Sequence, residues 1–204
     1  PWVRIGGMVL TKRDTKRDIL KAAKAVFAGK GYEASTMEDI AEKAGVRKAL
    51  IFYYYPSKEV LFLEAWNESI DELENTLFKE LSNESIYIRK LKKLFRSYID
   101  FVMSRREVMK LIEIDRVRIM DGPQDDGEWG RLRVRYNRFL NKIEELIEEG
   151  KEKNALPADI STKATAKLLE QMMGMGALEE NITLERIIRI ILSGMALEPE
   201  GIIL

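Results

Sequence analysis

The chain has 204 residues, of which 46% are hydrophobic and 33% are charged, and its 34 Lys and Arg balance its 34 Asp and Glu. A chain of this length and composition forms one or two packed domains rather than a disordered segment. It contains no Cys and no His, which excludes disulfides, thiolate zinc sites and catalysis by Ser-His-Asp or Cys-His groups.

The zero net charge hides an uneven distribution along the chain. Residues 1–60 hold 12 Lys and Arg against 7 Asp and Glu, so residues 61–204 carry a net charge of −5. A basic N-terminal part on an acidic remainder is typical of a nucleic-acid-binding head on a non-binding body. Helical proteins also scatter charge by chance, so the asymmetry alone leaves both interpretations open.

The predicted fold class is all-α with about nine helices, because apolar residues recur at spacings of three and four and alternating, strand-like runs are missing. Residues 1–10 are expected to form a mobile N-terminal tail. No segment has the pattern of a signal peptide or a membrane span, so we expect a cytoplasmic protein without a membrane partner.

A first helix is predicted from about Lys12 to Ala28. Thr11 is its expected N-cap, and Gly29 or Gly31 permits the left-handed exit at its other end. The spacing of the apolar residues places one buried face along this helix.

Two short helices follow, separated by a glycine turn. The second begins at Thr36, whose hydroxyl is placed to accept a hydrogen bond from the amide of Asp39, and it stops at Gly45. The third runs from Arg47 to about Tyr54, because the following proline bars continuation. This order of helix, tight turn and helix is the helix-turn-helix arrangement.

Three stretches in this region carry a family resemblance. They read Ile19-Leu-Lys-Ala-Ala-Lys-Ala-Val-Phe-Ala-Gly-Lys-Gly-Tyr32, Thr36-Met-Glu-Asp-Ile-Ala-Glu-Lys-Ala-Gly-Val46 and Phe52-Tyr-Tyr-Tyr-Pro-Ser-Lys-Glu59. Together and in this order they resemble the DNA-binding domain of tetracycline-repressor-type (TetR family) regulators. The resemblance covers only about the first quarter of the chain.

The resemblance implies two residues that contact DNA phosphate. Thr36 lies at the positive end of a helix, where free amides favour an anion, although its role as an N-cap requires no DNA. Lys58 matches the family lysine that opens the fourth helix and usually contacts the backbone. A solvated lysine is the alternative for Lys58.

The resemblance also places part of the third helix against base edges. Arg47 and Lys48 lie at the end that meets bases in helix-turn-helix complexes, unless both contact phosphate only. Tyr53 and Tyr54 occupy positions that face DNA in the family. The full set of expected DNA-binding residues is Thr36, Arg47, Lys48, Leu50, Tyr53, Tyr54 and Lys58.

Three residues of the third helix depart from the family pattern. Ala49 stands where the family often has Gly, Leu50 where it often has Thr, and Phe52 where it usually has Tyr. Phe52 lacks the hydroxyl that bonds phosphate, and Leu50 offers only apolar contact. We therefore expect an operator preference that differs from that of better-known members.

The resemblance implies that the remainder, residues 57–204, forms a helical body for effector binding and dimerisation. A long fourth helix from Ser57 to about Leu81 leads into it. Two apolar helices, about Thr162–Glu179 and Thr183–Leu197, suit the four-helix dimer interface of the family, or else an ordinary intramolecular core. The expected dimer residues are Gly174, Gly176, Ala177, Ile187, Ile188 and Ile191.

Polar residues inside apolar stripes are the candidates for orienting a ligand in this body. Asp115, Arg133 and Gln171 have this placement, although Asp115 and Arg133 could equally pair with each other or with another helix. The candidate wall of the pocket is Phe95, Tyr98, Met120, Trp129 and Met172.

Six arginines form two dense runs around residues 122–127. They are either an anion site, for an effector such as the acyl-coenzyme A that some family members bind, or solvated faces balanced by carboxylates. The arginines are Arg116, Arg118, Arg131, Arg133, Arg135 and Arg138, and the carboxylates are Glu144, Glu145, Glu148 and Glu149.

These patterns predict a tail (1–10), a helix-turn-helix domain (11–56) and a helical body (57–204). The expected function is a ligand-responsive repressor that binds a palindromic DNA operator as a homodimer and is released by a small apolar or amphipathic effector. The alternatives are an all-helical small-molecule carrier and a sequence-neutral DNA-packaging protein. No metal, cofactor or enzymatic activity is expected.

Overall fold

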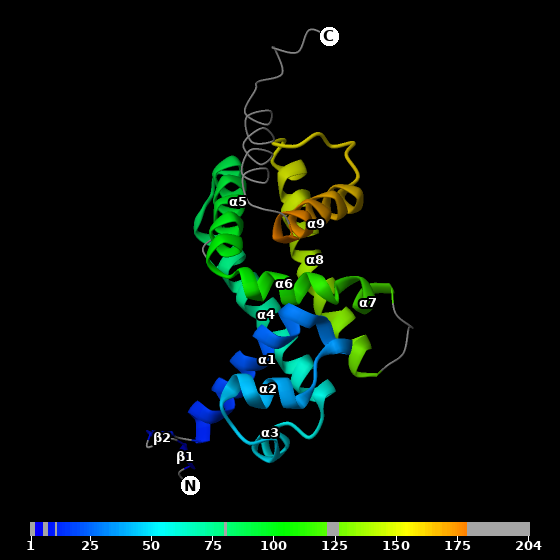
Figure 1. The fold of residues 1–204 in the computed structure, drawn as a ribbon. Helices are drawn as coiled ribbons and strands as arrows, with labels where there is room; N and C mark the ends of the chain where they lie inside the picture. The colour runs from blue at the N-terminus through cyan, green and yellow to red at the C-terminus, as the bar shows by residue number, and fades with distance from the viewer. Residues whose placement is uncertain (1–2, 6–7, 11, 80, 122–126, 179–204) are drawn as a thin grey trace. The chain divides into compact units, whose positions relative to one another are not determined.

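The computed structural model describes residues 3–5, 8–10, 12–79, 81–121 and 127–178 (Figure 1). Within these ranges the chain forms nine α-helices, one 3-10 turn and two short strands, so the all-helical class is confirmed. None of the described helices combines the length and the apolarity needed to cross a bilayer.

The two strands were not expected from the sequence. β1 (Val3–Ile5) and β2 (Met8–Leu10) pair antiparallel, with Val3 opposite Leu10. The overlooked signal is the Gly6-Gly7 pair between two apolar runs, which is a typical hairpin sequence. Part of the expected tail therefore has regular structure.

Helix α1 (Lys12–Ala34) runs beyond its predicted end at Ala28 and is broken near its end by Gly31, at φ 72° and ψ 173°. Of the two glycines proposed for the exit, Gly31 is the one in the left-handed region. The hydroxyl of Ser35 donates to the Gly31 carbonyl at 2.6 Å and closes the turn. The expected N-cap, Thr11, lies outside the described residues.

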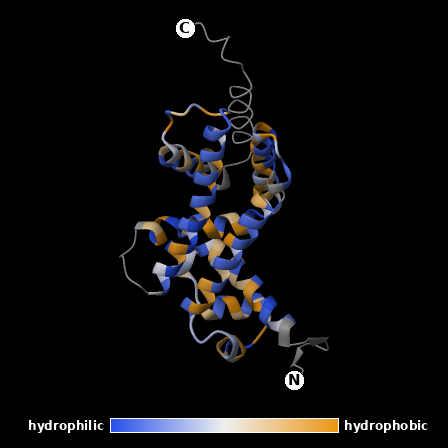
Figure 2. Cartoon of the chain, turned by 180° about the vertical axis from the view of Figure 1, so that it is seen from behind, coloured by the Kyte–Doolittle hydropathy of each residue, from blue (hydrophilic) through white to orange (hydrophobic). Residues whose placement is uncertain are grey.

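The remaining helices have the following bounds. They are α2 (Met37–Ala44), α3 (Lys48–Tyr54), α4 (Lys58–Phe78), α5 (Tyr87–Ser104), α6 (Arg106–Ile114), α7 (Arg116–Asp121), α8 (Glu128–Glu152) and α9 (Thr162–Leu178), with a 3-10 turn at Leu81–Asn83. Helix α4 ends a few residues before the predicted Leu81. Figure 2 shows hydrophobic and hydrophilic residues distributed around these helices as in amphipathic elements.

Contacts divide the chain into two compact units. Unit 1 comprises Pro1–Glu72 and Glu107–Asn137, and unit 2 comprises Leu73–Arg106 and Arg138–Leu204. The chain passes from one unit to the other inside α4, inside α8 and at the start of α6. The predicted boundary between a DNA-binding domain and a body at residues 56 and 57 stays a prediction.

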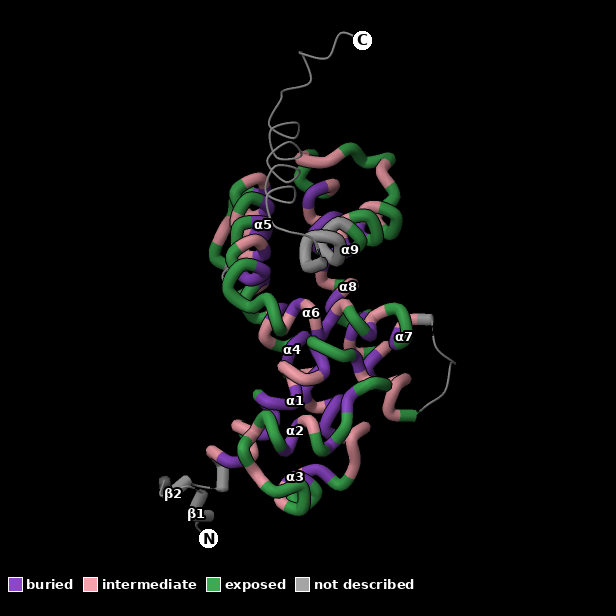
Figure 3. Tube along the Cα trace, viewed as in Figure 1, coloured by how far each residue is buried: buried purple, intermediate pink, exposed green. Residues whose placement is uncertain are grey.

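An aromatic and aliphatic core holds unit 1 together. Phe27, Phe62, Trp66 and Ile70 are fully buried, and Figure 3 shows the buried stretches of α1 and α4 in purple. At the surface, the ammonium of Lys16 lies 2.7 Å from a carboxylate oxygen of Glu64, so an ion pair also joins α1 to α4.

Unit 2 has a core of its own, built on the apolar face of α5. The buried residues of α5 are Tyr87, Leu91, Leu94, Phe95, Tyr98, Phe101 and Val102. They recur at helical spacing, which explains why one side of this helix is buried. Lys90 of α5 donates to both carboxylate oxygens of Glu149 of α8, at 2.7 and 2.8 Å.

Gly150 of α8 lies directly against the buried ring of Tyr87. A Cβ atom at residue 150 would lie 2.3 Å from Cζ of that ring. We expect Gly150→Ala to lower the free energy of unfolding by about 1 to 2 kcal/mol, because overpacking costs about 1 to 3 kcal/mol and the better helix propensity of Ala returns less than about 1 kcal/mol. Urea denaturation measures this change.

The matched control is Gly29→Ala in α1, where an added Cβ meets nothing within 4 Å. Its expected effect is neutral, or a gain of about 0.5 to 1 kcal/mol from helix propensity. Equal stability changes in the two variants would contradict the packing of Gly150 against Tyr87.

Candidate functional site

Helices α2 and α3 and the turn between them form the candidate nucleic-acid interface. Gly45 adopts φ 66° and ψ 30°, in the left-handed region, and the amide of Val46 donates to the carbonyl of Ala41 at 3.0 Å. A residue with a Cβ is strained in this conformation, so the glycine permits the tight turn. Buried Ile40 and Ile51 anchor the two helices to the core.

Burial of one side of α3 leaves the predicted DNA-reading side exposed. Ile51 and Tyr55 are fully buried, whereas Arg47, Lys48 and Tyr53 are exposed, with 65% of Tyr53 accessible. Figure 3 shows the exposed stretches of α2 and α3 in green. The structure thus brings three of the expected residues to one solvent-facing end of unit 1.

Two other expected DNA-binding residues of α3 are partly covered. Leu50 and Tyr54 are half-buried. The ring of Tyr54 packs edge to face against Tyr53, with ring centroids 5.1 Å apart. Their DNA contacts stay predictions.

Thr36 caps α2, as the sequence predicted. Its hydroxyl accepts a hydrogen bond from the amide of Asp39 at 3.1 Å, and the Asp39 carboxylate accepts from the amide of Thr36 at 2.9 Å. Because Thr36 is exposed, the cap leaves it at the surface beside the free amides of the helix end. Contact with phosphate stays a prediction.

The capping carboxylate has a strongly lowered pKa. Hydrogen bonds from the ammonium of Lys30, at 2.8 Å, and from Thr36 lower the pKa of Asp39 to about 2. Because the folded-state pKa lies below the ordinary value of 3.8, the stabilisation from these bonds is present above that value and is lost as the pH falls through about 2.

We expect Lys30→Ala to raise the pKa of Asp39 toward its ordinary value, because Lys30 makes the largest contribution to the shift. Carbon-detected NMR titration of the carboxyl group measures the change. In the control Lys21→Ala, which removes an exposed lysine of the same helix, the pKa of Asp39 should stay near 2.

Lys58 is half-buried, and its ammonium is hydrogen-bonded within unit 1. Its ammonium donates to the carbonyls of Tyr32 and Ser35, at 2.9 and 3.0 Å, and lies 4.3 Å from the centroid of the Tyr32 ring. These carbonyls are at the end of α1, so Lys58 ties the start of α4 to that end. The expected phosphate contact of Lys58 stays a prediction.

We expect Lys58→Met to lower the free energy of unfolding by about 1 to 2 kcal/mol, because it leaves partly buried carbonyls without a charged donor. Urea denaturation measures the loss. The control Lys21→Met removes an exposed lysine of α1 and should change stability by less than about 0.5 kcal/mol. Equal effects would assign Lys58 no structural role.

Four of the residues proposed for the ligand pocket lie in unit 1. Asp115 is buried and accepts a hydrogen bond from the amide of Tyr32 at 3.1 Å, and burial raises the pKa of its carboxyl group. Arg133 donates through Nε to the carbonyl of Ile119 at 3.0 Å. Met120 is half-buried. Both polar residues therefore have structural partners within the unit.

Trp129, the fourth of these residues, belongs to an aromatic cluster. Its ring lies 5.0 Å from Tyr32 and 5.2 Å from Phe62, centroid to centroid, and the guanidinium of Arg118 lies 4.3 Å from its centroid. The cluster joins α1, α4, α7 and α8 within unit 1.

Gln171 lies on a face of α9 that is exposed in this structure, and its ligand role stays a prediction. It is exposed, as are Ala164 and Leu168 of the same predicted stripe. Helix α9 buries Ala166 and Glu170 instead, because a stripe read from the sequence does not say which face of the helix meets its neighbours.

An apolar cavity in unit 2 includes two predicted wall residues, Phe95 and Tyr98. Its lining is Leu77, Phe78, Leu94, Phe95, Tyr98, Ile143 and Leu169, from α4, α5, α8 and α9. Its volume is about 10 Å³, room for about one water molecule. The other residues that line this cavity were not predicted. In the sequence they show only the apolar spacing of a helix, which does not distinguish a pocket from a core.

Several of the six arginines pair with carboxylates outside the expected set. Arg118 pairs with Glu33, and Arg131 lies 3.2 Å from Glu128. Arg135 donates to Asp71 through Nε at 3.0 Å. Carboxylates therefore balance the charge of these arginines, as one of the two predicted alternatives had it, but they are not the four glutamates named there.

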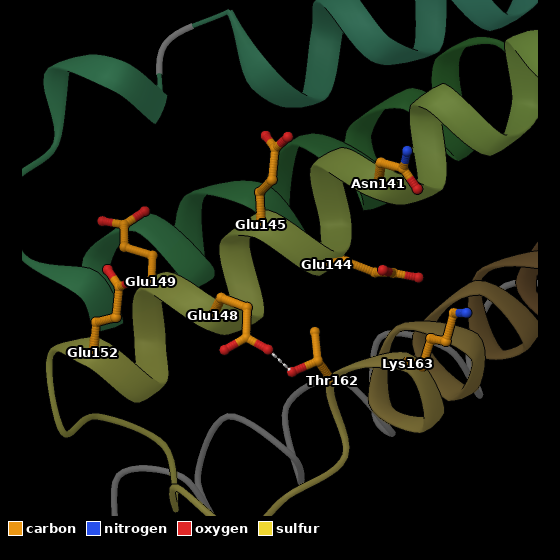
Figure 4. Close-up of a pocket in the computed structure, with 8 residues that line it drawn as sticks. All are labelled: Asn141, Glu144, Glu145, Glu148, Glu149, Glu152, Thr162 and Lys163. Atoms are coloured by element: carbon orange, nitrogen blue, oxygen red, sulfur yellow. Dashed lines mark hydrogen bonds between the residues drawn. The ribbon is translucent and has the colours of Figure 1, made fainter.

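The four glutamates expected to balance the arginines line a cleft of about 740 Å³ in unit 2 (Figure 4). Its lining is Asn141, Glu144, Glu145, Glu148, Glu149, Glu152, Thr162 and Lys163. Figure 4 shows Glu148 hydrogen-bonded to Thr162. Among the described residues, no group of three or more carboxylates is placed to hold a metal ion.

The structure does not test the predicted dimer residues. Gly174, Gly176, Ala177 and the wall residue Met172 fall within the bounds of α9, and the structure describes nothing further of them. Ile187, Ile188 and Ile191 lie outside the described part of the chain altogether.

Comparison with known proteins connects this geometry to regulators. Residues 19–65 match the sequence model described as bacterial regulatory proteins, tetR family. The HTH-type transcriptional regulator YfiR of Bacillus subtilis is 26% identical over 141 residues, which cover 68% of this chain and 66% of that protein. The chain thus spans just under two thirds of this relative's length.

Two solved structures share the fold. A fatty acid metabolism regulator of Clostridium perfringens, described as putative, is 25% identical with a TM-score of 0.72, over 92% of this chain and 99% of that one. The regulator FadR of Bacillus subtilis, in complex with stearoyl-CoA, is 16% identical with a TM-score of 0.68, over 88% of this chain and 97% of that one.

Proposed function

We propose that the chain, whose residues 19–65 match the sequence model of the tetR family of bacterial regulatory proteins, is a sequence-specific, DNA-binding transcriptional repressor. The observation that carries the proposal is the α2–Gly45–α3 arrangement with Arg47, Lys48 and Tyr53 exposed on α3. In a helix-turn-helix, the start of the second helix meets the edges of the bases. The guanidinium of an Arg there can bind a guanine edge through two hydrogen bonds, and a Lys can bind guanine or phosphate. The protein acts by binding rather than catalysis, in the cytoplasm where its DNA lies.

The proposed active form is a homodimer on a palindromic operator. Two heads separated by about 34 to 36 Å enter successive major grooves. The two helices predicted within residues 162–197 supply the apolar surface for the dimer, because apolar faces of this extent need cover.

The proposed effector is an apolar or amphipathic molecule with an acyl chain, bound in the unit 2 cavity. The aliphatic and aromatic lining of that cavity supports an acyl chain, as do the C. perfringens and B. subtilis neighbours, whose descriptions name fatty acid metabolism and stearoyl-CoA. The cavity has a volume of only about 10 Å³, so an acyl chain must displace side chains of its wall to enter. The protein with the chain bound therefore differs in conformation from the free protein, and an effector acts by binding one of two conformations more tightly.

The test is selection of bound duplexes from a random pool, followed by fluorescence anisotropy against selected and scrambled duplexes at about 0.15 M salt. A preference of about a thousandfold or more, with two protomers per duplex, supports the dimeric regulator. Equal, salt-sensitive binding to both duplexes would instead identify a sequence-neutral packaging protein. Titration of the selected complex with acyl-coenzyme A thioesters of graded chain length tests release by the effector, and binding of the thioesters without any DNA preference would identify a carrier.

A further inference from the structure

An ion pair joins the two helices of the helix-turn-helix at its exposed side. The ammonium of Lys48, at the start of α3, binds a carboxylate oxygen of Glu38 in the first turn of α2. The same ammonium lies 5.6 Å from the centroid of the Phe52 ring. Lys48 is thus held between a carboxylate and a ring on the surface that faces DNA in the proposed function.

The pair is open to solvent and therefore exchangeable. The side chain of Lys48 is 45% exposed and that of Glu38 is 64% exposed. Ion pairs of this kind are weak, because water and salt screen both charges. The hydrogen bond from Lys48 lowers the pKa of the Glu38 carboxyl group, which is ionised at neutral pH even at its ordinary pKa.

We propose that Glu38 is a specificity-determining residue of the DNA-binding head, a role that rests on the proposed function. On DNA of arbitrary sequence, Lys48 stays with Glu38 and contributes no phosphate contact. On the operator, the docked head places a phosphate or a guanine edge where it replaces the carboxylate, and Lys48 transfers to the DNA. Glu38 therefore weakens operator binding by the full strength of the ion pair, which must break there, and weakens arbitrary binding by less, because the pair stays intact.

The proposal predicts a gain of selectivity in Glu38→Gln. Because no ion pair has to break, binding to the selected duplex should tighten by a factor of about 2 to 5, the strength of one exposed ion pair. Binding to a random-sequence duplex should tighten by less than this factor, because its contact with the freed Lys48 is weaker than the ion pair, so the ratio between the two duplexes rises. On the random-sequence duplex the slope of log affinity against log salt should also become steeper by about 1, the signature of one additional phosphate contact.

The control is Glu42→Gln, which removes the same charge from α2. Glu42 lies one helical turn beyond Glu38 and is also exposed, whereas the ion pair of Lys48 is with Glu38. Loss of a nearby negative charge alone should raise the affinity for both duplexes by the same factor. The ratio of the two affinities should then stay unchanged. Equal behaviour of the two variants would overturn the proposal.

A second measurement separates this proposal from the proposed function. In the free protein, Lys48→Gln should raise the pKa of Glu38 toward its ordinary value in an NMR titration, and an unchanged pKa would show that the pair does not form. If the wild-type protein binds neither duplex, the proposed function fails and the role of Glu38 fails with it. If the wild type prefers the selected duplex and Glu38→Gln leaves the ratio between the two duplexes unchanged, only the role of Glu38 fails.

Discussion

Replacing Phe62 by Ala is expected to lower the free energy of unfolding by about 3 to 5 kcal/mol. Phe62 is fully buried near the start of α4. Its ring lies 5.1 Å from Phe27, 5.0 Å from Tyr32 and 5.2 Å from Trp129, centroid to centroid. Truncation removes the hydrophobic burial of the ring, leaves a cavity among three aromatic neighbours and deletes the edge-to-face contacts with Phe27 and Tyr32.

Urea denaturation, monitored by tryptophan fluorescence and by circular dichroism, measures this loss. The control is Phe52→Ala on α3, where the ring is 43% exposed, and its expected change is less than about 0.5 kcal/mol. A loss below about 1 kcal/mol for Phe62→Ala would show that the cluster is not packed as the structure has it. The cost matters for DNA binding, because the cluster holds the end of α1 against α4 directly beside α2.

The helix-turn-helix was predictable because its determinants are local. Thr36 and Asp39 are three residues apart and form their capping box within one turn of α2. Gly45 stops the helix through its own backbone conformation. Where partners lie within a few positions along the chain, spacing alone indicates the contact.

Determinants that join distant segments were not predictable in the same way. The sequence indicates that Asp115 is a polar residue on an apolar stripe, and the structure confirms its burial, but its partner is the amide of Tyr32, 83 positions away. Lys58 likewise finds its carbonyls at the end of α1. A backbone amide or carbonyl carries no side-chain identity, so no residue type marks it in advance as a partner.

Periodicity also fails to distinguish the faces of a helix. The stripe that contains Gln171 repeats at the correct interval, yet it is exposed in unit 2 while Glu170 is buried. Helical spacing shows that residues share a face, whereas burial depends on which neighbour covers that face. The same reasoning explains why the sequence did not predict the full lining of the apolar cavity. Its lining residues Leu94 and Ile143 have the spacing of ordinary core residues.

Arg47→Ala is expected to reduce the preference for the selected duplex over a scrambled one by about ten- to a hundredfold, the value of one bidentate base contact. Arg47 is exposed at the N-cap position of α3 and uses no side-chain hydrogen bond to cap that helix. Its guanidinium can therefore reach a guanine edge without breaking a capping contact. Because the side chain is exposed and does not cap α3, the free energy of unfolding should change by less than about 0.5 kcal/mol.

Two further variants isolate the reading role of Arg47 in the same anisotropy measurement. Arg47→Lys keeps the charge but lacks the planar fork, so it should restore affinity for the scrambled duplex without restoring the preference. The control Arg131→Ala removes a 73% exposed arginine of α8, outside the helix-turn-helix, and should leave the preference at the wild-type ratio. If Arg47→Ala also keeps that ratio, Arg47 contacts phosphate only, and sequence choice must come from Lys48 and the exposed rings of α3.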